Sequence, residues 1–286
     1  MKLKYKFLII IFLLFLLAGI TYLYAMYIGT KGFKIKEYKI KSSTISEDYN
    51  GLKIAHLSDI HYGNKSITKK DLENIVKKIN SLKPDIIVLT GDLVDKDINS
   101  KQYEDLVDVL SKLDATINKY AIDGNHDYSY KKWSSLIEDC DFVNLNDTYD
   151  VIYNNSYDSI FIAGISNNTY TTKNIKDKSE VILDYLNSEE YNSTYSILLM
   201  HEPDYIDDID YSKFDIVMAG HSHNGQVRIP IFGAIILPDG SKQYYKEHYT
   251  LNNTDLYISS GIGTSTLPIR LFNRPSANFY RIVKED

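Results

Sequence analysis

The chain has 286 residues, which is long enough for one large α/β domain with a sizeable core. Its hydrophobic content of 44% and charged content of 24% are those of an ordinary globular protein, and a net charge of -6 argues against a nucleic-acid partner, because phosphate backbones require a basic face. The one cysteine, Cys140, excludes an internal disulfide framework.

The N-terminal segment differs in kind from the rest of the chain. Residues 7–30 form a run of 24 residues without a charge, with Tyr22, Tyr24 and Tyr27 near its C-terminal end, where an aromatic belt would lie. As a helix this run would reach roughly 36 Å, against a hydrocarbon core of about 30 Å. A cleaved signal peptide is the alternative, but its apolar region is usually about 7–15 residues long and is followed by a small-x-small site. We therefore expect residues 1–30 to form an uncleaved transmembrane anchor.

Lysines flank this segment on both sides, so their count alone does not orient it. Because long downstream domains often cross a membrane regardless of flanking charge, we expect a single-pass cell-membrane protein whose soluble part is extracytoplasmic. Residues 31–50 are polar and lysine-rich, which fits a juxtamembrane linker or a first edge strand. We assign 31–50 to a linker and 51–286 to one globular domain.

From residue 51 onward, short apolar runs alternate with amphipathic stretches. The patterns predict strands at 52–58, 85–90, 119–122, 142–154, 160–165, 195–200 and 214–220, and helices at 68–83, 101–113, 130–139 and 176–188. The tail, 226–283, predicts strands without long helices. Helices and strands alternate in the first part of this region and strands dominate the later part, which favours one α/β domain with a mixed sheet.

Polar side chains gather just after five of the apolar strands. The segments that follow them read SDIHYG, TGDLVD, DGNHDY, MHEPD and AGHSHNG. They carry Asp59, His61, Asp92, Asp95, Asn125, His126, Asp127, His201, His221 and His223. Ligands of open α/β sheets bind outside the carboxyl ends of strands, so these side chains should meet in one place.

The residue types at these strand ends predict a metal site. Single motifs have ordinary explanations as turns or helix caps, but five in succession do not. Imidazole and oxygen ligands without a thiolate suit Mn, Fe or Zn, in the divalent or trivalent state, and the candidates suffice for two ions. Two neighbouring metal ions are typical of enzymes that cleave phosphoesters.

These motifs, in this order, resemble those of the calcineurin-like metallophosphoesterases. The matching segments are D-x-H at 59–61, G-D-x-x-D at 91–95, G-N-H-D at 124–127, the lone His201 and G-H-x-H at 220–223. The resemblance spans roughly residues 50–283. The segments GHSHNGQVRIP and LYISSGIGTSTLPIRLFNRP are similar to the bacterial membrane-associated phosphodiesterase branch, some of whose members cleave UDP-2,3-diacylglucosamine.

The resemblance implies a four-layer αββα sandwich with two mixed sheets and a dinuclear centre. One ion would be held by Asp59, His61, Asp92 and His223, and the other by Asp92, Asn125, His201 and His221. His126 would act on the phosphoryl charge or the leaving oxygen, with Asp95 orienting its ring, while Asp127 would support the ligands from behind. Arg228 and Arg270, two of four arginines, would contact phosphate or serve at the surface.

The implied function is membrane-anchored hydrolysis of phosphodiester or pyrophosphate bonds, including those of lipid-linked or envelope substrates. One departure from the branch pattern is Asn224, which stands where a glycine usually follows the H-x-H pair. One alternative is a protein Ser/Thr phosphatase, although those enzymes carry G-N-H-E where this chain has G-N-H-D. Another is a non-catalytic scaffold of the same fold, but such relatives lack several of the ligands that are present here. A nuclease is disfavoured by the acidic charge and the anchor.

Overall fold

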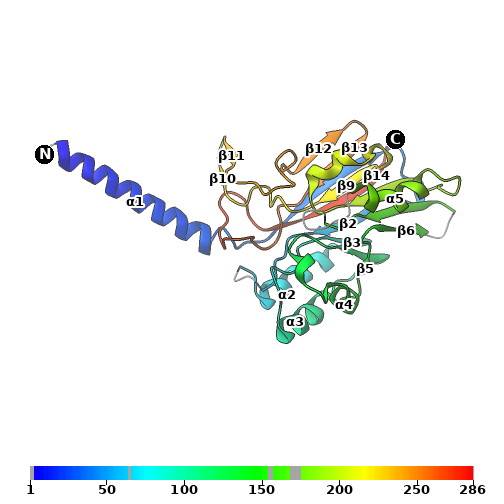
Figure 1. Ribbon diagram of the computed structural model, residues 1–286, viewed down its shortest axis with the longest axis horizontal. Helices are drawn as coiled ribbons and strands as arrows, with labels where there is room; N and C mark the ends of the chain where they lie inside the picture. The colour runs from blue at the N-terminus through cyan, green and yellow to red at the C-terminus, as the bar shows by residue number, and fades with distance from the viewer. Residues whose placement is uncertain (1–2, 64–65, 154–156, 168–174, 286) are drawn as a thin grey trace.

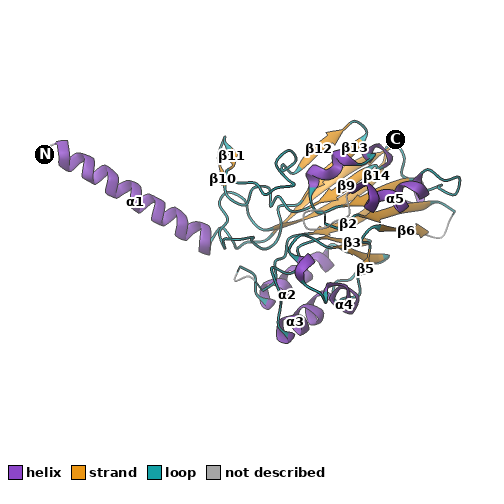
Figure 2. Ribbon diagram, in the orientation of Figure 1, coloured by secondary structure: helices purple, strands orange, loops and turns teal. Residues whose placement is uncertain are grey.

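Two six-stranded β-sheets lie face to face at the centre of the molecule, and helices cover their outer faces (Figures 1 and 2). The computed structural model describes residues 3–63, 66–153, 157–167 and 175–285. The four-layer α/β arrangement with two mixed sheets confirms the fold expected from the sequence, and one long apolar helix precedes it.

The first sheet has the strand order β1-β14-β2-β3-β4-β5. Its strands are β1 (Lys34–Ser42), β2 (Leu52–Leu57), β3 (Ile86–Thr90), β4 (Asn118–Ile122), β5 (Val143–Asn144) and β14 (Ser276–Lys284). All neighbours are parallel except β14 and β2. The helices α2 (Lys69–Ser81), α3 (Ser100–Leu110) and α4 (Trp133–Asp139) lie between its strands in the chain.

The second sheet has the order β12-β13-β9-β8-β7-β6 and is also mixed. Its strands are β6 (Thr148–Tyr153), β7 (Ser159–Gly164), β8 (Tyr195–Leu199), β9 (Ile216–Ala219), β12 (His248–Leu251) and β13 (Thr254–Ile258). The helix α5 (Ile175–Leu186) packs on its outer face. The strands β10 (Arg228–Ile229) and β11 (Gly233–Ala234) form a separate two-stranded hairpin that belongs to neither sheet.

Alternating side chains of the strands divide the interior into three apolar layers. In β3, Ile86 and Val88 pack between the sheets, whereas Ile87 and Leu89 pack under the first group of helices. A third layer joins the second sheet to α5 and includes Phe161. This period of two is what a strand covered on both faces requires, so the strand positions are set by burial.

Residues 31–50 contain a strand of the first sheet rather than only a linker. β1 runs parallel to β14 over nine residue pairs, from Lys34 opposite Ser276 to Ser42 opposite Lys284. The segment therefore contains the edge strand that was one of the two alternatives, while its assignment to a juxtamembrane linker stays a prediction. Its lysines suggested a solvated linker, but Lys36 extends to Glu247, with its Nζ 2.9 Å from Oε1.

The helix α1 (Leu3–Tyr27) is the one element long and apolar enough to cross a membrane among the described residues. It projects away from the rest of the molecule (Figure 1), and of its side chains only Ala25 is buried. The division of the chain into anchor, linker and globular domain stays a prediction.

The layer between the sheets supports the loops that leave the strand ends, so we predict a large effect of opening a cavity there. Ile162→Ala, at a fully buried position of β7, should lower the free energy of unfolding by about 2–5 kcal/mol. Val181→Ala, on the outer side of α5 with 57% of the residue exposed, is the control and should change it by less than about 0.5 kcal/mol. Urea unfolding of the full chain in detergent, followed by circular dichroism, would measure both. Equal effects would contradict the placement of Ile162 in the core.

Candidate metal centre

The loops that follow β2, β3, β4, β8 and β9 converge at one end of the two sheets. All ten polar residues predicted to meet there are carried by these loops. Seven of them form three groups of imidazole and carboxylate side chains whose ligand atoms lie within 4.8 Å of one another in each group. The groups are Asp59–His61–His223, His61–Asp92–His126 and Asp92–His201–His221.

The first group brings together the loops after β2 and β9. Nε2 of His223 lies 3.1 Å from Nε2 of His61 and 3.4 Å from Oδ1 of Asp59. All three side chains are buried. Two imidazoles and one carboxylate facing a common point are a donor set that suits a first-row transition metal.

A second donor set forms around the other side of Asp92. Nε2 of His201 lies 3.4 Å from Oδ2 of Asp92 and 3.1 Å from Oδ1 of Asn125. His221 adds a second imidazole, with its ring centroid 5.0 Å from that of His201. The sequence had placed these four residues on four different loops, and the structure joins them.

Asp92 is the residue that the two sets share. Its Oδ2 lies 3.5 Å from Nε2 of His61 and 3.4 Å from Nε2 of His201, while its Oδ1 accepts a 2.8 Å hydrogen bond from the backbone N–H of His126. Burial alone would raise the pKa of Asp92, but His201 and His61 hold this pKa well below its usual range. The carboxylate is therefore charged at neutral pH.

Backbone carbonyl groups orient two of the imidazoles. Nδ1 of His201 donates to the Thr90 carbonyl at 2.7 Å, and Nε2 of His221 donates to the Asp239 carbonyl at 2.7 Å. These bonds leave Nε2 of His201 and Nδ1 of His221 available to the site, which is the usual arrangement behind metal-binding histidines. Burial also lowers the pKa of His221 to about 4, so this ring is neutral. The sequence carries no signal for such carbonyl partners.

Five of the candidate ligands have left-handed backbone conformations that residues other than glycine rarely adopt. Their φ angles are +51° for Asp59, +48° for His61, +52° for Asp92, +64° for His221 and +46° for His223. Each such residue costs roughly 1–3 kcal/mol, and strain of this kind concentrates at functional sites. Backbone strain and the sequence motifs are independent observations, and both single out the same residues.

Two glycines permit the close approach of these loops. A Cβ atom at Gly124 would collide with the Asp92 carboxylate, and one at Gly220 would collide with Oγ of Ser58 and lie 2.7 Å from Oδ2 of Asp59. The glycines of the G-N-H-D and G-H-x-H segments are thus required by packing against the ligands themselves.

His126 lies at the edge of the centre, where a substrate could reach it. Its Nδ1 lies 2.9 Å from the Asp95 carbonyl oxygen and 3.4 Å from Oδ1 of Asp95, so Asp95 orients the ring. Burial alone would lower the pKa of His126, but Asp95 and Asp92 raise it to about 9. Oδ1 of Asp95 also lies 3.3 Å from Nδ1 of His61.

Asp127 supports the loops rather than facing the centre. Its carboxylate accepts hydrogen bonds from the backbone N–H groups of Leu93, Val94 and Gly124 at 3.0–3.2 Å. It thereby ties the loop after β3 to the loop after β4, which hold Asp92 and Asn125. This position agrees with the supporting role expected from the sequence.

The two candidate phosphate-binding arginines have protein partners in the described structure. Arg270 is fully buried, and its Nη2 lies 3.1 Å from Nδ1 of His223 while its Nε donates to the Gly263 carbonyl at 2.9 Å. Arg228 donates to the Asn224 carbonyl at 2.7 Å. Asn224 in turn donates to Glu247, which accounts for a side chain at this position. Phosphate binding by either arginine stays a prediction, and Arg270 contacts His223, a candidate metal ligand.

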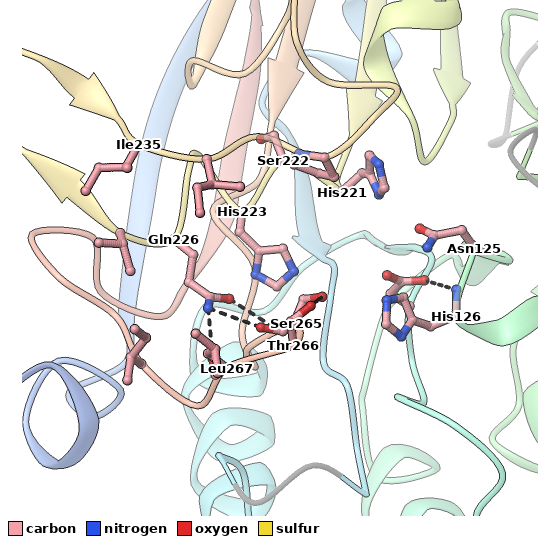
Figure 3. A pocket seen from close by; sticks show the side chains of 15 residues that line it. Asn125, His126, His221, Ser222, His223, Gln226, Ile235, Ser265, Thr266 and Leu267 are labelled. Atoms are coloured by element: carbon pink, nitrogen blue, oxygen red, sulfur yellow. Dashed lines mark hydrogen bonds between the residues drawn. The ribbon is translucent and has the colours of Figure 1, made fainter. Parts of the chain in front are cut away.

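A cavity of about 530 Å³ opens over the centre (Figure 3). Asp92, Asn125, His126, His221 and His223 line one side of it. The opposite side is apolar and is formed by Val227, Ile235, Ile236, Pro238, Leu267 and Ile269. The side chain of Gln226 donates to the carbonyl groups of Ser265 and Leu267 and joins the two loops of this apolar side. Sequence reasoning missed the apolar wall, because its residues look like ordinary strand residues of the tail.

Comparisons with known proteins agree with this centre. The family model described as calcineurin-like phosphoesterase matches residues 52–225, which contain all five polar loops. A Bacillus subtilis protein named uncharacterized metallophosphoesterase YkuE is 32% identical over 282 residues, which cover 93% of this chain and 91% of that protein. A Danio rerio protein named transmembrane protein with metallophosphoesterase domain is 26% identical, over 84% of this chain and 55% of that protein.

Among solved structures, the protein TT1561 of Thermus thermophilus has a similar fold, with a TM-score of 0.52 at 14% identity. The match covers 74% of this chain and 91% of that one. The family model spans more than half of this sequence, and the metal-binding side chains expected of such a protein lie together at the strand ends. The chain therefore belongs to the calcineurin-like phosphoesterase family.

Proposed function

We propose that the protein is a membrane-anchored phosphoesterase with two metal ions, and that it hydrolyses phosphodiester or pyrophosphate bonds. The observation that carries this proposal is the position of Asp92, whose Oδ2 lies between His61 and His201 at 3.5 and 3.4 Å. A carboxylate in this position can bridge two ions. A scaffold without catalysis would not need to keep both donor sets intact around it.

The donor sets fit transition-metal ions such as Mn, Fe or Zn. One ion is assigned to Asp59, His61, Asp92 and His223, and the other to Asp92, Asn125, His201 and His221. Imidazole and oxygen donors without a thiolate suit these metals, and the side chain of Cys140 is buried under α4 in a different part of the molecule. When bound, two such ions supply an acidified water and neutralise charge on the phosphoryl oxygens.

The protein's own residues position the substrate and its protons. Nδ1 of His126 is engaged by Asp95, so the other edge of the ring faces the cavity and can donate a proton to the leaving oxygen or stabilise the phosphoryl charge. Asp92 keeps the backbone of His126 in place through Oδ1. The same carboxylate thus links the metal sites to the proton donor.

A preference for diesters is supported by the two-sided cavity and by the resemblance of the G-N-H-D and G-H-S-H-N-G-Q segments to the diesterase branch. Polar groups on one side can hold the phosphoryl group, and the apolar side can take the second substituent that a monoester lacks. The apolar helix α1 and the word transmembrane in the name of one relative support anchoring. An extracytoplasmic position of the domain stays a prediction.

We predict two transition-metal ions per chain after loading with Mn, Fe or Zn, and the loss of both in Asp92→Asn. The shared carboxylate contributes to each site, so the amide should weaken both. Elemental analysis of the purified full chain would measure this. His248→Ala, at a histidine on β12 that pairs with Asp255, is the control and should keep the full metal content. One ion or none in the well-folded parent protein would contradict the dinuclear centre.

We predict that His126→Ala lowers turnover of a diester with a poor leaving group by about 10²–10⁴-fold while metal content stays the same. The reason is that His126 is assigned to proton transfer and not to metal binding. Turnover and elemental analysis on the same preparation would separate the two roles. Parallel loss of metal and activity would make His126 a ligand instead.

We predict a higher kcat/KM for a bis-ester of phosphate than for the corresponding monoester. The apolar wall of the cavity stabilises the second substituent of a bis-ester, whereas the apolar residues of that wall offer no cationic side chain to the second negative charge of a monoester. Steady-state rates on bis(nitrophenyl) phosphate and nitrophenyl phosphate would test this. A clear preference for the monoester, or for a phosphoserine peptide, would favour a phosphatase.

A further inference from the structure

Large apolar side chains are exposed beside the cavity, and two of them, Ile236 and Leu267, also line it. They belong to the β10–β11 hairpin, to the residues just after it and to the loop before β14, and we call them the apolar rim: Ile229, Ile231, Phe232, Ile236, Leu267 and Phe272. Ile231 is 103% exposed, Phe232 84% and Ile236 80%. Residues 229–238 contain no charge. An exposed apolar patch of this kind marks a binding surface, and its occupant can be inferred from what lies beside it.

The apolar rim lies next to α1. One groove of about 440 Å³ is lined on one side by α1 residues from Leu14 to Ala25 and on the other by Val227, Ile269 and Leu271. The backbone N–H of Arg270 donates to the Ala25 carbonyl at 2.9 Å, and Arg274 donates to the Lys31 carbonyl at 3.0 Å. Figure 1 shows the β10–β11 hairpin on the side of the molecule from which α1 extends.

This contact sets the depth of the apolar rim relative to a bilayer. Leu14 lies about a third of the way along the uncharged segment, 7–30, and about 20 Å from Tyr27 along a helix that rises about 1.5 Å per residue. When α1 crosses a bilayer, the groove between Leu14 and Ala25 therefore lies within it. Val227, Ile269 and Leu271 face the same groove, so the loops that carry the rim lie at the membrane surface or below it.

The groove and the catalytic cavity are neighbours. Val227 and Ile269 line both of them, so these two side chains separate α1 from the cavity. The apolar wall of the cavity continues through Ile236 and Leu267 into the apolar rim. The apolar surface of the cavity wall is therefore continuous with the apolar rim beside α1.

We propose that the apolar rim is inserted in the lipid bilayer beside α1, and that the apolar wall of the cavity takes the alkyl chain of a phosphoester drawn from that bilayer. The second half rests on the proposed phosphoesterase function. In the reaction, the oxygen of water forms a bond to phosphorus, the bond from phosphorus to the leaving oxygen breaks, and that oxygen leaves with a proton. The chain-bearing part stays in the membrane.

Insertion is tested by placing a fluorescent label at the hairpin tip of the full-length protein in phosphatidylcholine–phosphatidylglycerol vesicles. Phe232→Cys can be labelled selectively because the native Cys140 is buried. Tyr157→Cys is the matched control, since Tyr157 is 95% exposed and lies in the chain between β6 and β7. The strand β6 is at the end of the molecule remote from α1 (Figure 1). Nitroxide groups on the lipid chains should quench the label at 232 several-fold more than the label at 157. Equal quenching at the two positions would overturn the proposal.

Chain binding is tested with two diesters, hexadecyl nitrophenyl phosphate in the same vesicles and methyl nitrophenyl phosphate in solution. The double substitution Ile231→Asp and Phe232→Asp should lower kcat/KM for the hexadecyl diester by about tenfold or more and leave the methyl diester unchanged. Tyr157→Asp should affect neither. Equal effects of the double substitution on both diesters would overturn the chain-binding half.

The two tests separate the failure of this proposal from the failure of the proposed function. A metal-loaded parent protein that hydrolyses neither diester would refute the phosphodiesterase, and with it the chain-binding half, while quenching would still decide insertion. A different result would be quenching of the label at 232 by a water-soluble quencher but not by the lipid nitroxides, together with self-association through the hairpin. That result would overturn bilayer insertion and identify a second copy of the chain as the occupant of the apolar rim.

Discussion

The centre of this structure depends on one buried carboxylate. Asp92 contacts a histidine from each donor set through Oδ2 and the backbone of His126 through Oδ1, so three loops are held in register by a single side chain. Because its pKa is held well below its usual range, the group remains an acceptor at neutral pH. The glycine at 124 is required for the same reason, since any Cβ there would occupy the position of the carboxylate. The polar centre is therefore supported by electrostatics and by close packing at once.

The strained loops show how the two sheets contribute to that centre. The strands end in apolar layers, and the candidate ligands after β2, β3 and β9 follow within a few residues in left-handed backbone conformations. This strain of roughly 1–3 kcal/mol per residue is offset by the three apolar layers that hold the strands. The strained geometry of the candidate ligands therefore depends on the stability that the apolar layers contribute.

The four-layer fold was implied by the resemblance to a known family, whereas the sequence pattern itself predicted most of the strands and the residues that meet at the strand ends. It could do so because burial imposes a period of two on the strands and because each ligand follows its strand directly. The pairing of β1 with β14 could not be predicted, since it joins segments more than 230 residues apart and the strand carries lysines that look solvated, of which Lys36 is partly buried against Glu247. Neither the contact of Arg270 with His223 nor the apolar wall left a local signal, because both depend on which loops become neighbours.

The pairing of β1 with β14 also has a mechanical consequence. Only residues 28–33 separate α1 from a strand that is held by nine residue pairs, so no flexible tether lies between the helix and the sheet. A lateral force on α1 would load β1 in shear along its whole ladder of hydrogen bonds instead of extending a loose coil. With α1 in a bilayer, as proposed, a domain held in this way would not swivel to scan the solution around it. Its encounters with molecules of the bilayer would be governed by two-dimensional diffusion. The mouth of the cavity would stay at one height and one tilt relative to the bilayer plane.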